Sequence, residues 1–250
     1  MFIKETNLFI ETFDFIKKNI IKIFLISIFY SFLLVVSDFY IIPTIQRIYF
    51  SVLQKDNNMY SLIHIFDFMT FYNKKMFLQF SFLRNVVYIT SITFIIESII
   101  MIAHFKIFEK KNNLYKLYKK FFYIFPNLFV LIFFINVIVQ IGLVLLIFPA
   151  IIFSIFLSLS PIILMIEKKS MFLSIKKSLL ICFLKYKELS FPIILWLLVK
   201  FALLTISTIF KFSPENLFCF LYNSISNFFL CILIVYLFKF YSLFKPIKKF

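Results

Sequence analysis

The sequence predicts an all-α fold: a polytopic helical membrane protein with about six transmembrane helices and short amphipathic interfacial helices. Hydrophobic residues make up 63% of the chain and the mean hydropathy is +1.01, which is not the composition of a soluble domain. The stretch 121–166 contains no charged residue. Most of the lysines cluster at the ends of apolar runs, as residues at a membrane surface do.

The uncharged stretch 121–166 is the element around which the other predictions are built. As one straight helix it would be ~69 Å long at ~1.5 Å per residue, more than twice the ~30 Å thickness of the hydrocarbon core. We therefore expect two spans that return the flanking lysines to the same face of the membrane. Gly142, the only glycine, lies where a tight reversal is needed.

The other apolar runs predict four more spans, so that residues 1–250 form a single membrane domain. Residues 1–19 predict an amphipathic helix on the membrane surface, since Phe9, Phe13 and Ile16 recur at helical spacing among charges. The next run is too long for a cleaved signal peptide, and Pro43 is expected to end it. The predicted spans are 20–42, 86–105, 121–140, 143–166, 191–210 and 217–238.

Two basic segments, 106–120 and 167–190, each carry six lysines. In 167–190, Met171, Ile175 and Leu179 recur on one face and predict an interfacial helix. The lysines of 106–120 are more simply explained as residues that fix the topology, and a basic interfacial segment is the alternative. The net charge of +16 could indicate nucleic acid, but the lysines follow apolar runs. The expected partners are therefore the lipid bilayer and its anionic headgroups, with no nucleic acid. If both termini lie in the cytoplasm, the inner segments carry about 20 Lys and Arg against about six outside, as the positive-inside rule requires.

The sequence lacks the common motifs of catalytic and cofactor sites. One glycine is too few for a phosphate-binding loop, and neither GxSxG nor HExxH occurs. His64 and Asp67 could share a helix face. A His and an Asp placed in this way more often form a surface hydrogen bond than a catalytic pair. The cysteines and histidines lack the spacing of metal ligands; they are Cys182, Cys219, Cys231, His64 and His104. We therefore expect no bound metal, no cofactor and no enzyme activity.

Three segments carry a family resemblance, with VQIG, the following FP and the SP before an acidic residue in register. They are PNLFVLIFFINVIVQIGLVLLIFPAIIFSIFLSLSPIILMIEKK (126–169), ILWLLVKFALL (194–204) and NSISNFFLCILIVYLFKFYSLF (223–244). Over roughly 120–245 the chain resembles the YciC family of inner-membrane proteins from enteric bacteria. The resemblance implies a multi-pass protein of the bacterial inner (plasma) membrane with no established activity. This chain departs from the family at Ala150, where glycine is usual, and at Glu97, where the family has glutamine.

Ionisable residues inside spans are the default candidates for a functional site in a membrane protein. Glu97 lies ~12 Å from the cytoplasmic end of the second predicted span, at ~1.5 Å per residue. By the same rise, Lys200 lies ~13 Å from the cytoplasmic end of the fifth. The matching depths predict that the two side chains face each other inside the bundle.

Four amide side chains inside spans complete the candidate intramembrane polar site. Asn136 and Gln140 are four residues apart in the third span, and Asn223 and Asn227 are four apart in the sixth. Such amides commonly join helices by hydrogen bonds. The alternative is that they line a polar path with the two charged residues.

These features favour a non-catalytic structural or accessory protein of the envelope. The alternative is a small transporter or channel that uses Glu97 and Lys200. Repeats and convergent charges are typical of transporters, and the sequence has no convincing repeat. An intramembrane enzyme ranks last, because it needs several acidic, histidine or metal-binding residues at one depth.

Overall fold

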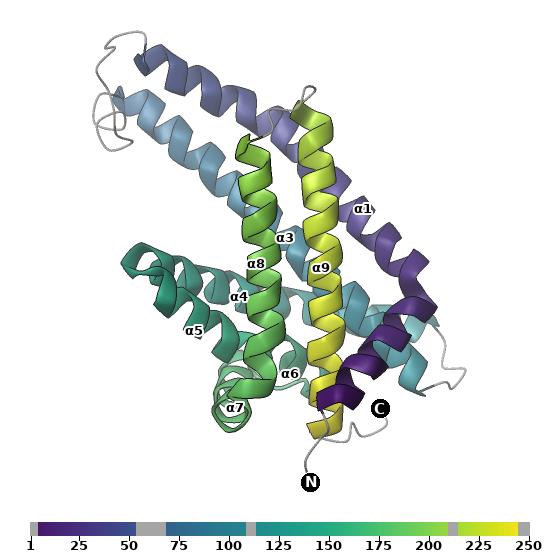
Figure 1. Ribbon diagram of the computed structural model, residues 1–250. Coiled ribbons are helices and arrows are strands. Elements are labelled where there is room, and N and C mark those ends of the chain that lie inside the picture. The colour runs from purple at the N-terminus through teal and green to yellow at the C-terminus, as the bar shows by residue number, and fades with distance from the viewer. Residues whose placement is uncertain (1–4, 54–68, 109–113, 210–214, 245–250) are drawn as a thin grey trace.

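The structure is a computed structural model that describes residues 5–53, 69–108, 114–209 and 215–244. These residues form eight helices and no strand (Figure 1). The helices are α1 (Glu5–Leu53), α3 (Phe71–Phe108), α4 (Leu114–Leu145), α5 (Ile147–Leu157), α6 (Ser160–Glu167), α7 (Met171–Leu184), α8 (Tyr186–Ile209) and α9 (Glu215–Phe244).

Within this described part of the chain, six segments are long and apolar enough to cross a membrane. The predicted fold class, a polytopic helical membrane protein, is confirmed. The helices extend beyond the predicted spans, often by a turn or more. The six segments are Leu8–Ile41, Phe71–His104, Phe122–Leu145, Ile147–Glu167, Tyr186–Ile206 and Phe218–Phe244.

Helix α1 bends at Asn19, whose backbone leaves the helical region at φ −126° and ψ 17°. The Asn19 side-chain amide donates to the carbonyl oxygen of Phe15 at 2.8 Å, a bond within the preceding turn. The bend separates the predicted amphipathic segment from the first span. The prediction that Pro43 ends this helix is wrong, since α1 continues to Leu53. Proline inside a membrane helix is tolerated when neighbouring groups satisfy the freed carbonyl.

The reversal between α4 and α5 occurs at Leu146, with φ −165° and ψ 155°, and not at Gly142 as predicted. Gly142 is a helical residue of α4 with a negative φ. A Cβ atom there would lie 2.9 Å from the Cα of Ala150 and 3.1 Å from the ring of Phe153. The glycine is therefore needed for close contact between two helices and not for turn geometry.

The fourth predicted span is broken into α5 and α6 around Ser158 and Leu159. Pro161 stands in the first turn of α6, where its missing N–H costs nothing. Helix α6 ends at Lys168, which adopts the left-handed conformation at φ 52°.

Helix α7 confirms that the basic segment 167–190 contains a helix. Its buried residues are Ser174, Ser178, Ile181 and Cys182, three of which have short side chains. The Ser178 hydroxyl donates to the carbonyl oxygen of Phe156 at 2.6 Å, and the Cys182 thiol donates to that of Ile155 at 3.4 Å. Short side chains thus bring α7 against the backbone of α5.

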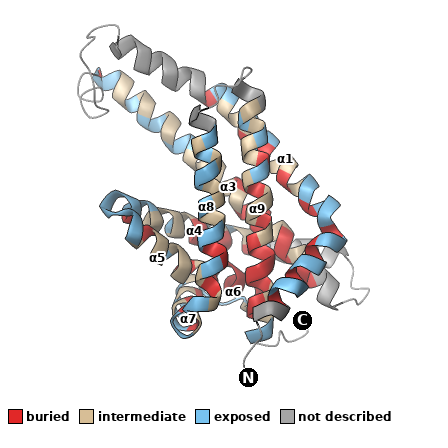
Figure 2. Ribbon diagram, viewed as in Figure 1, coloured by how far each residue is buried: buried red, intermediate tan, exposed pale blue. Residues whose placement is uncertain are grey.

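Helix α9 lies beside α8 and contacts α1, α3 and α6 (Figure 1). Figure 2 shows that buried residues gather on α6 and on the C-terminal half of α9. Tyr241, Phe238 and Phe240 are among the largest fully buried side chains. The core of the bundle is therefore centred on the last helix of the chain.

Two predicted features lie outside the described residues: the turn at Asn57 and Asn58, and the pair His64 and Asp67. Residues 109–113 of the first basic segment also lie outside them. Helix α4 begins within that segment, at Leu114.

Candidate functional site

Lys200 lies on α8 and is half-buried inside the bundle. Its ammonium group donates to the hydroxyl oxygen of Tyr88 on α3 at 3.1 Å. The same group lies 5.2 Å from the centre of the Trp196 ring and 5.7 Å from that of the Tyr88 ring. The Trp196 ring and the Tyr88 hydroxyl therefore stabilise the positive charge.

Glu97 is half-buried on α3 and makes no hydrogen bond or ion pair with any other described residue. It follows Tyr88, the partner of Lys200, by nine residues, which is ~13.5 Å along a helix. The predicted pairing of Glu97 with Lys200 is therefore wrong. The depth count fails because α3 and α8 both extend beyond the predicted spans and α3 crosses α8 obliquely (Figure 1).

Two of the four amide candidates join neighbouring helices. The Asn136 side chain of α4 donates to the Asn85 side-chain oxygen of α3 at 3.4 Å. The Asn227 side chain of α9 is buried and donates to the hydroxyl of Ser31 on α1 at 2.9 Å. Both bonds are of the kind that holds membrane helices together.

The other two amide candidates, Gln140 and Asn223, do not join neighbouring helices. Gln140 is exposed and Asn223 is half-buried. Neither side chain makes a hydrogen bond with another described residue. Asn136 and Gln140 lie on α4, and Asn223 and Asn227 lie on α9. Only one residue of each pair forms a hydrogen bond with a neighbouring helix.

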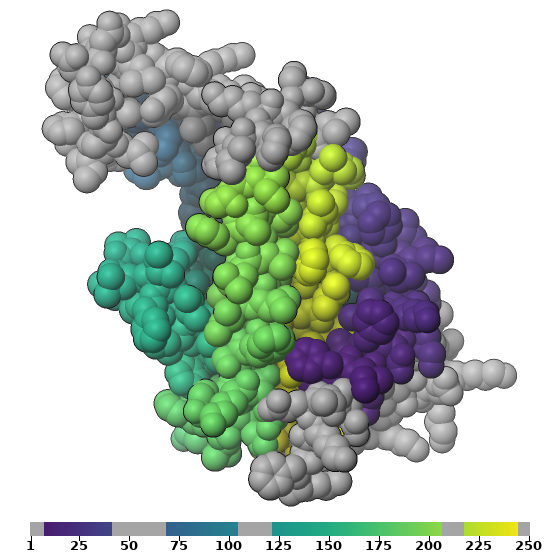
Figure 3. All heavy atoms as spheres, in the orientation of Figure 1, coloured from purple at the N-terminus to yellow at the C-terminus, as the bar shows by residue number. Residues whose placement is uncertain are grey.

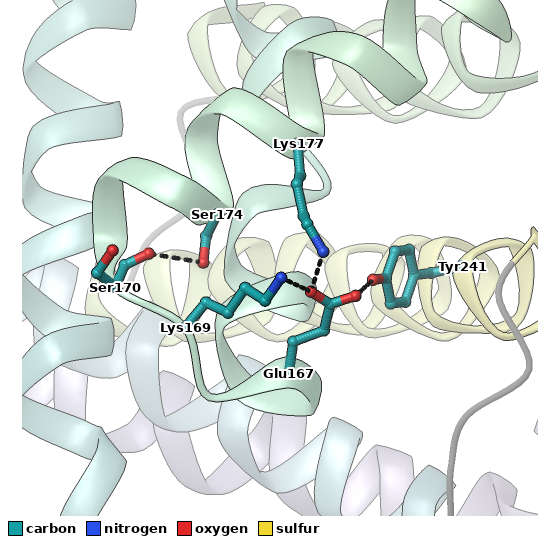
Figure 4. A network of polar contacts seen from close by, with 6 residues as sticks. All are labelled: Glu167, Lys169, Ser170, Ser174, Lys177 and Tyr241. Carbon is teal, nitrogen blue, oxygen red and sulfur yellow. Dashed lines mark hydrogen bonds and ion pairs between the residues drawn. The ribbon is translucent and has the colours of Figure 1, made fainter.

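A charged network that the sequence did not predict joins three helices around Glu167, the last residue of α6 (Figure 4). One carboxylate oxygen accepts a hydrogen bond of 2.6 Å from the hydroxyl of Tyr241 on α9. The other oxygen forms ion pairs with Lys177 of α7 and with Lys169, the latter at 3.3 Å. The side chain of Glu167 is 9% exposed, whereas those of Lys169 and Lys177 are 39% and 30% exposed, so only the carboxylate end of the network is shielded from water.

From the sequence, Glu167 and the adjacent lysines marked only the end of a span. Tyr241 lies 74 residues from Glu167, and no pattern in the chain links the two. The available signal was the acidic residue itself, placed directly after an apolar run and before a basic helix.

Further ion pairs lie outside the Glu167 network, including one between α1 and α3 and one at the start of α8. Arg84 of α3 donates two hydrogen bonds to Asp38 of α1, at 2.8 and 3.4 Å. Lys185 pairs with Glu188 at 2.6 Å at the start of α8. The Lys185–Glu188 pair stabilises the start of α8, whereas the Arg84–Asp38 pair joins α3 to α1 one helical turn before Tyr88, the partner of Lys200.

An apolar groove of about 550 Å³ lies between α1 and α9. Its walls carry hydrocarbon side chains and the hydroxyl of Ser224, and its lining includes no titratable side chain that could act as a base toward that hydroxyl. The groove is suited to contact with lipid chains. Its lining residues are Ile20, Ile21, Phe24, Ile28, Phe220, Leu221, Ser224, Ile225 and Phe228.

Cys182 and Cys231 are buried and Cys219 is exposed. Burial raises the pKa of the Cys182 thiol to about 11, which makes the thiol a poor nucleophile at neutral pH. Within the part of the chain that the structure describes, no three His, Cys, Asp or Glu side chains gather into a metal-binding group.

Comparison with known proteins identifies the family of the chain. A family model described as "Uncharacterised protein family (UPF0259)" matches residues 1–243. The match therefore also includes the N-terminal half, where the resemblance seen in the sequence was weaker. No solved structure matches the chain.

Curated relatives named UPF0259 membrane protein occur in several bacteria. One from Buchnera aphidicola subsp. Acyrthosiphon pisum (strain Tuc7) is 35% identical over 234 residues, covering 94% of this chain and 95% of the relative. One from Buchnera aphidicola subsp. Baizongia pistaciae is 31% identical over 256 residues, and the match covers both chains completely. One from Yersinia pestis (strain Pestoides F) is 34% identical over 125 residues, half of this chain and 49% of the relative. The expected resemblance is confirmed, and the chain belongs to the uncharacterised membrane protein family UPF0259.

Proposed function

We propose that this membrane protein is a non-catalytic accessory component of the bacterial inner membrane, and not an enzyme. The observation that supports this function is that three polar side chains inside the predicted spans form hydrogen bonds between helices. Asn136, Asn227 and Lys200 each donate a hydrogen bond to a side chain on a neighbouring helix. Hydrogen bonds of this kind stabilise a helical bundle, which is the role that the proposal gives to these three side chains.

We also propose that both termini lie in the cytoplasm. The support is the distribution of lysines, which favours this orientation over the reverse by the positive-inside rule. In this orientation the exposed Lys176 of α7 meets the cytoplasmic leaflet, where anionic headgroups are the natural partners.

A small transporter or channel is the second candidate. Two observations favour it: Glu97 is half-buried without a partner among the described residues, and Lys200 has no carboxylate partner there. Intramembrane charges that are not neutralised by each other often mark a path for ions or substrates.

An ion-flux measurement separates the two candidates. The purified protein would be reconstituted into liposomes that enclose a pH-sensitive dye, and a proton or potassium gradient would be imposed. An accessory protein leaves the decay of the gradient equal to that of empty liposomes. A decay that is faster, and that the Lys200→Met variant abolishes, would support the transporter and overturn the accessory role.

The control is Leu198→Met on the same helix. Leu198 is 62% exposed, so the change should leave the surroundings of Lys200 intact. A leak that is equal in both variants would indicate damaged membranes and not a path at Lys200.

A further inference from the structure

The tip of the α4–α5 hairpin is an unusual helix end. Leu146 is the one non-helical residue between the two helices. Around it, seven large apolar side chains are between 54% and 87% exposed. They are Ile141, Leu143, Val144, Leu145, Leu146, Ile147 and Phe148.

Other connections between spans in this chain carry charges. Lys55 and Asp56 lie between α1 and α3, and Lys211 lies between α8 and α9. The α4–α5 connection has no charge within 20 residues on either side. A contiguous apolar patch of this size is rare on a surface that faces water, and marks contact with a membrane or a partner.

Two features of the backbone at the tip reduce the number of N–H groups that hydrocarbon would leave unsatisfied. A reversal inside a bilayer must leave few unsatisfied N–H and C=O groups. The Leu146 N–H donates to the carbonyl oxygen of Gly142 at 3.0 Å, and Pro149, in the first turn of α5, has no N–H to satisfy. Close packing of Gly142 on Ala150 further limits the open space between the two helices.

The path of the hairpin through the molecule also indicates that its tip contacts the membrane. In Figure 1, α4 runs across α8 and α9 and not along them, and in Figure 3 the hairpin forms a lobe at the side of the molecule. Lysines flank both of its bases, at 119–120 and 168–169. The hairpin therefore starts and ends on the same basic side of the membrane.

We infer that α4 and α5 form a re-entrant hairpin whose tip remains among the lipid acyl chains and does not emerge into water on the far side. The exposed surface at the tip binds hydrocarbon. The charge distribution of the other segments is unchanged by this placement, because a hairpin that enters and leaves on one side does not alter the side on which α7 and α8 begin.

The test combines thiol labelling with quenching by lipids. In a background without the three native cysteines, single variants Val144→Cys, Tyr72→Cys and Ser170→Cys would be treated with a membrane-impermeant maleimide from each side. Tyr72 and Ser170 are exposed residues outside the hairpin and serve as controls for the two sides. We expect both controls to react from one side each, and Val144→Cys to remain unlabelled from both sides.

The second measurement identifies what covers the tip. In a Trp196→Phe background, the fluorescence of Val144→Trp would be recorded in vesicles of phospholipids brominated along the acyl chain. Strong quenching, together with protection from maleimide, is the expected result. Labelling from the far side at the rate of the exposed control would overturn the inference. Protection without quenching would also overturn it, since a protein partner would then cover the tip.

Discussion

The hydroxyl of Tyr241 donates a hydrogen bond to the carboxylate of Glu167 at 2.6 Å, joining the end of α9 to the end of α6. Lys177 brings α7 to the same carboxylate, so three helices meet at one acidic residue (Figure 4). Tyr241 is 1% exposed, and its hydroxyl has been removed from water to make this contact. A hydrogen bond to a charged group in such a site contributes ~1.5–3 kcal/mol.

Replacement of Tyr241 by phenylalanine is expected to lower the stability of the protein by ~1.5–3 kcal/mol, because Glu167 loses a donor while it stays buried. Thermal unfolding in detergent would measure the change. Tyr123→Phe is the matched control, since Tyr123 is 84% exposed. Equal melting temperatures for the two variants would show that the network does not stabilise the fold.

The contact between Asn227 and Ser31 is expected to contribute a coupling free energy of ~0.6 kcal/mol, the average for such bonds between membrane helices. A double-mutant cycle of Asn227→Leu and Ser31→Ala would measure it. Gln140→Leu is the control, because Gln140 is exposed and the change should not destabilise the bundle. Strict additivity of the two single changes would contradict the contact.

Gly142→Ala is expected to destabilise the hairpin by ~1–3 kcal/mol, as overpacking does, because the new methyl group would meet the backbone of Ala150 at 2.9 Å. Accumulation in membranes and thermal unfolding would both report the loss. Ala202→Leu, an enlargement at an exposed site of α8, should be neutral. A Gly142→Ala variant as stable as the parent would mean that α4 and α5 do not approach this closely.

The native cysteines are expected to differ in reactivity. Cys182 and Cys231 are fully buried, and the pKa of the Cys182 thiol is raised to about 11. A raised pKa leaves little thiolate at pH 8, so a thiol reagent should modify Cys219 first, and all three cysteines only after denaturation. Mass spectrometry of the labelled folded protein would count the modified sites. Rapid modification of Cys182 at pH 8 would contradict its burial.

The sequence predicted the elements that depend on composition and periodicity. The apolar runs located six helices, and the change of pattern near Asn19 coincided with the bend in α1. The apolar residues that recur on one face of the basic segment 167–190 indicated a helix, which the structure shows as α7. These features follow from local residue choice, which a single sequence contains.

Contacts between distant segments could not be predicted in the same way. Counting from span ends placed Glu97 beside Lys200, because the count assumed parallel helices of known length. The position of Tyr88 opposite Lys200 depends on how obliquely α3 crosses α8, and that angle is set by packing of all the helices together. Gly142 was identified as special, but its role was assigned to a turn when it lies in a helix contact.

The central claim is that the interior of the bundle around Lys200 is dry and structural. The most direct test is to measure whether water reaches that interior while Glu97 and Lys200 are both unchanged. Single cysteines at Ile92 and Leu197, one turn from Tyr88 and Lys200 and packed on the core, would be exposed to impermeant maleimide from each side. We predict protection from both sides in folded protein, while Tyr72→Cys and Ser170→Cys react. Labelling of Ile92→Cys or Leu197→Cys at the rate of these controls would show that water reaches Lys200, and would contradict the accessory role.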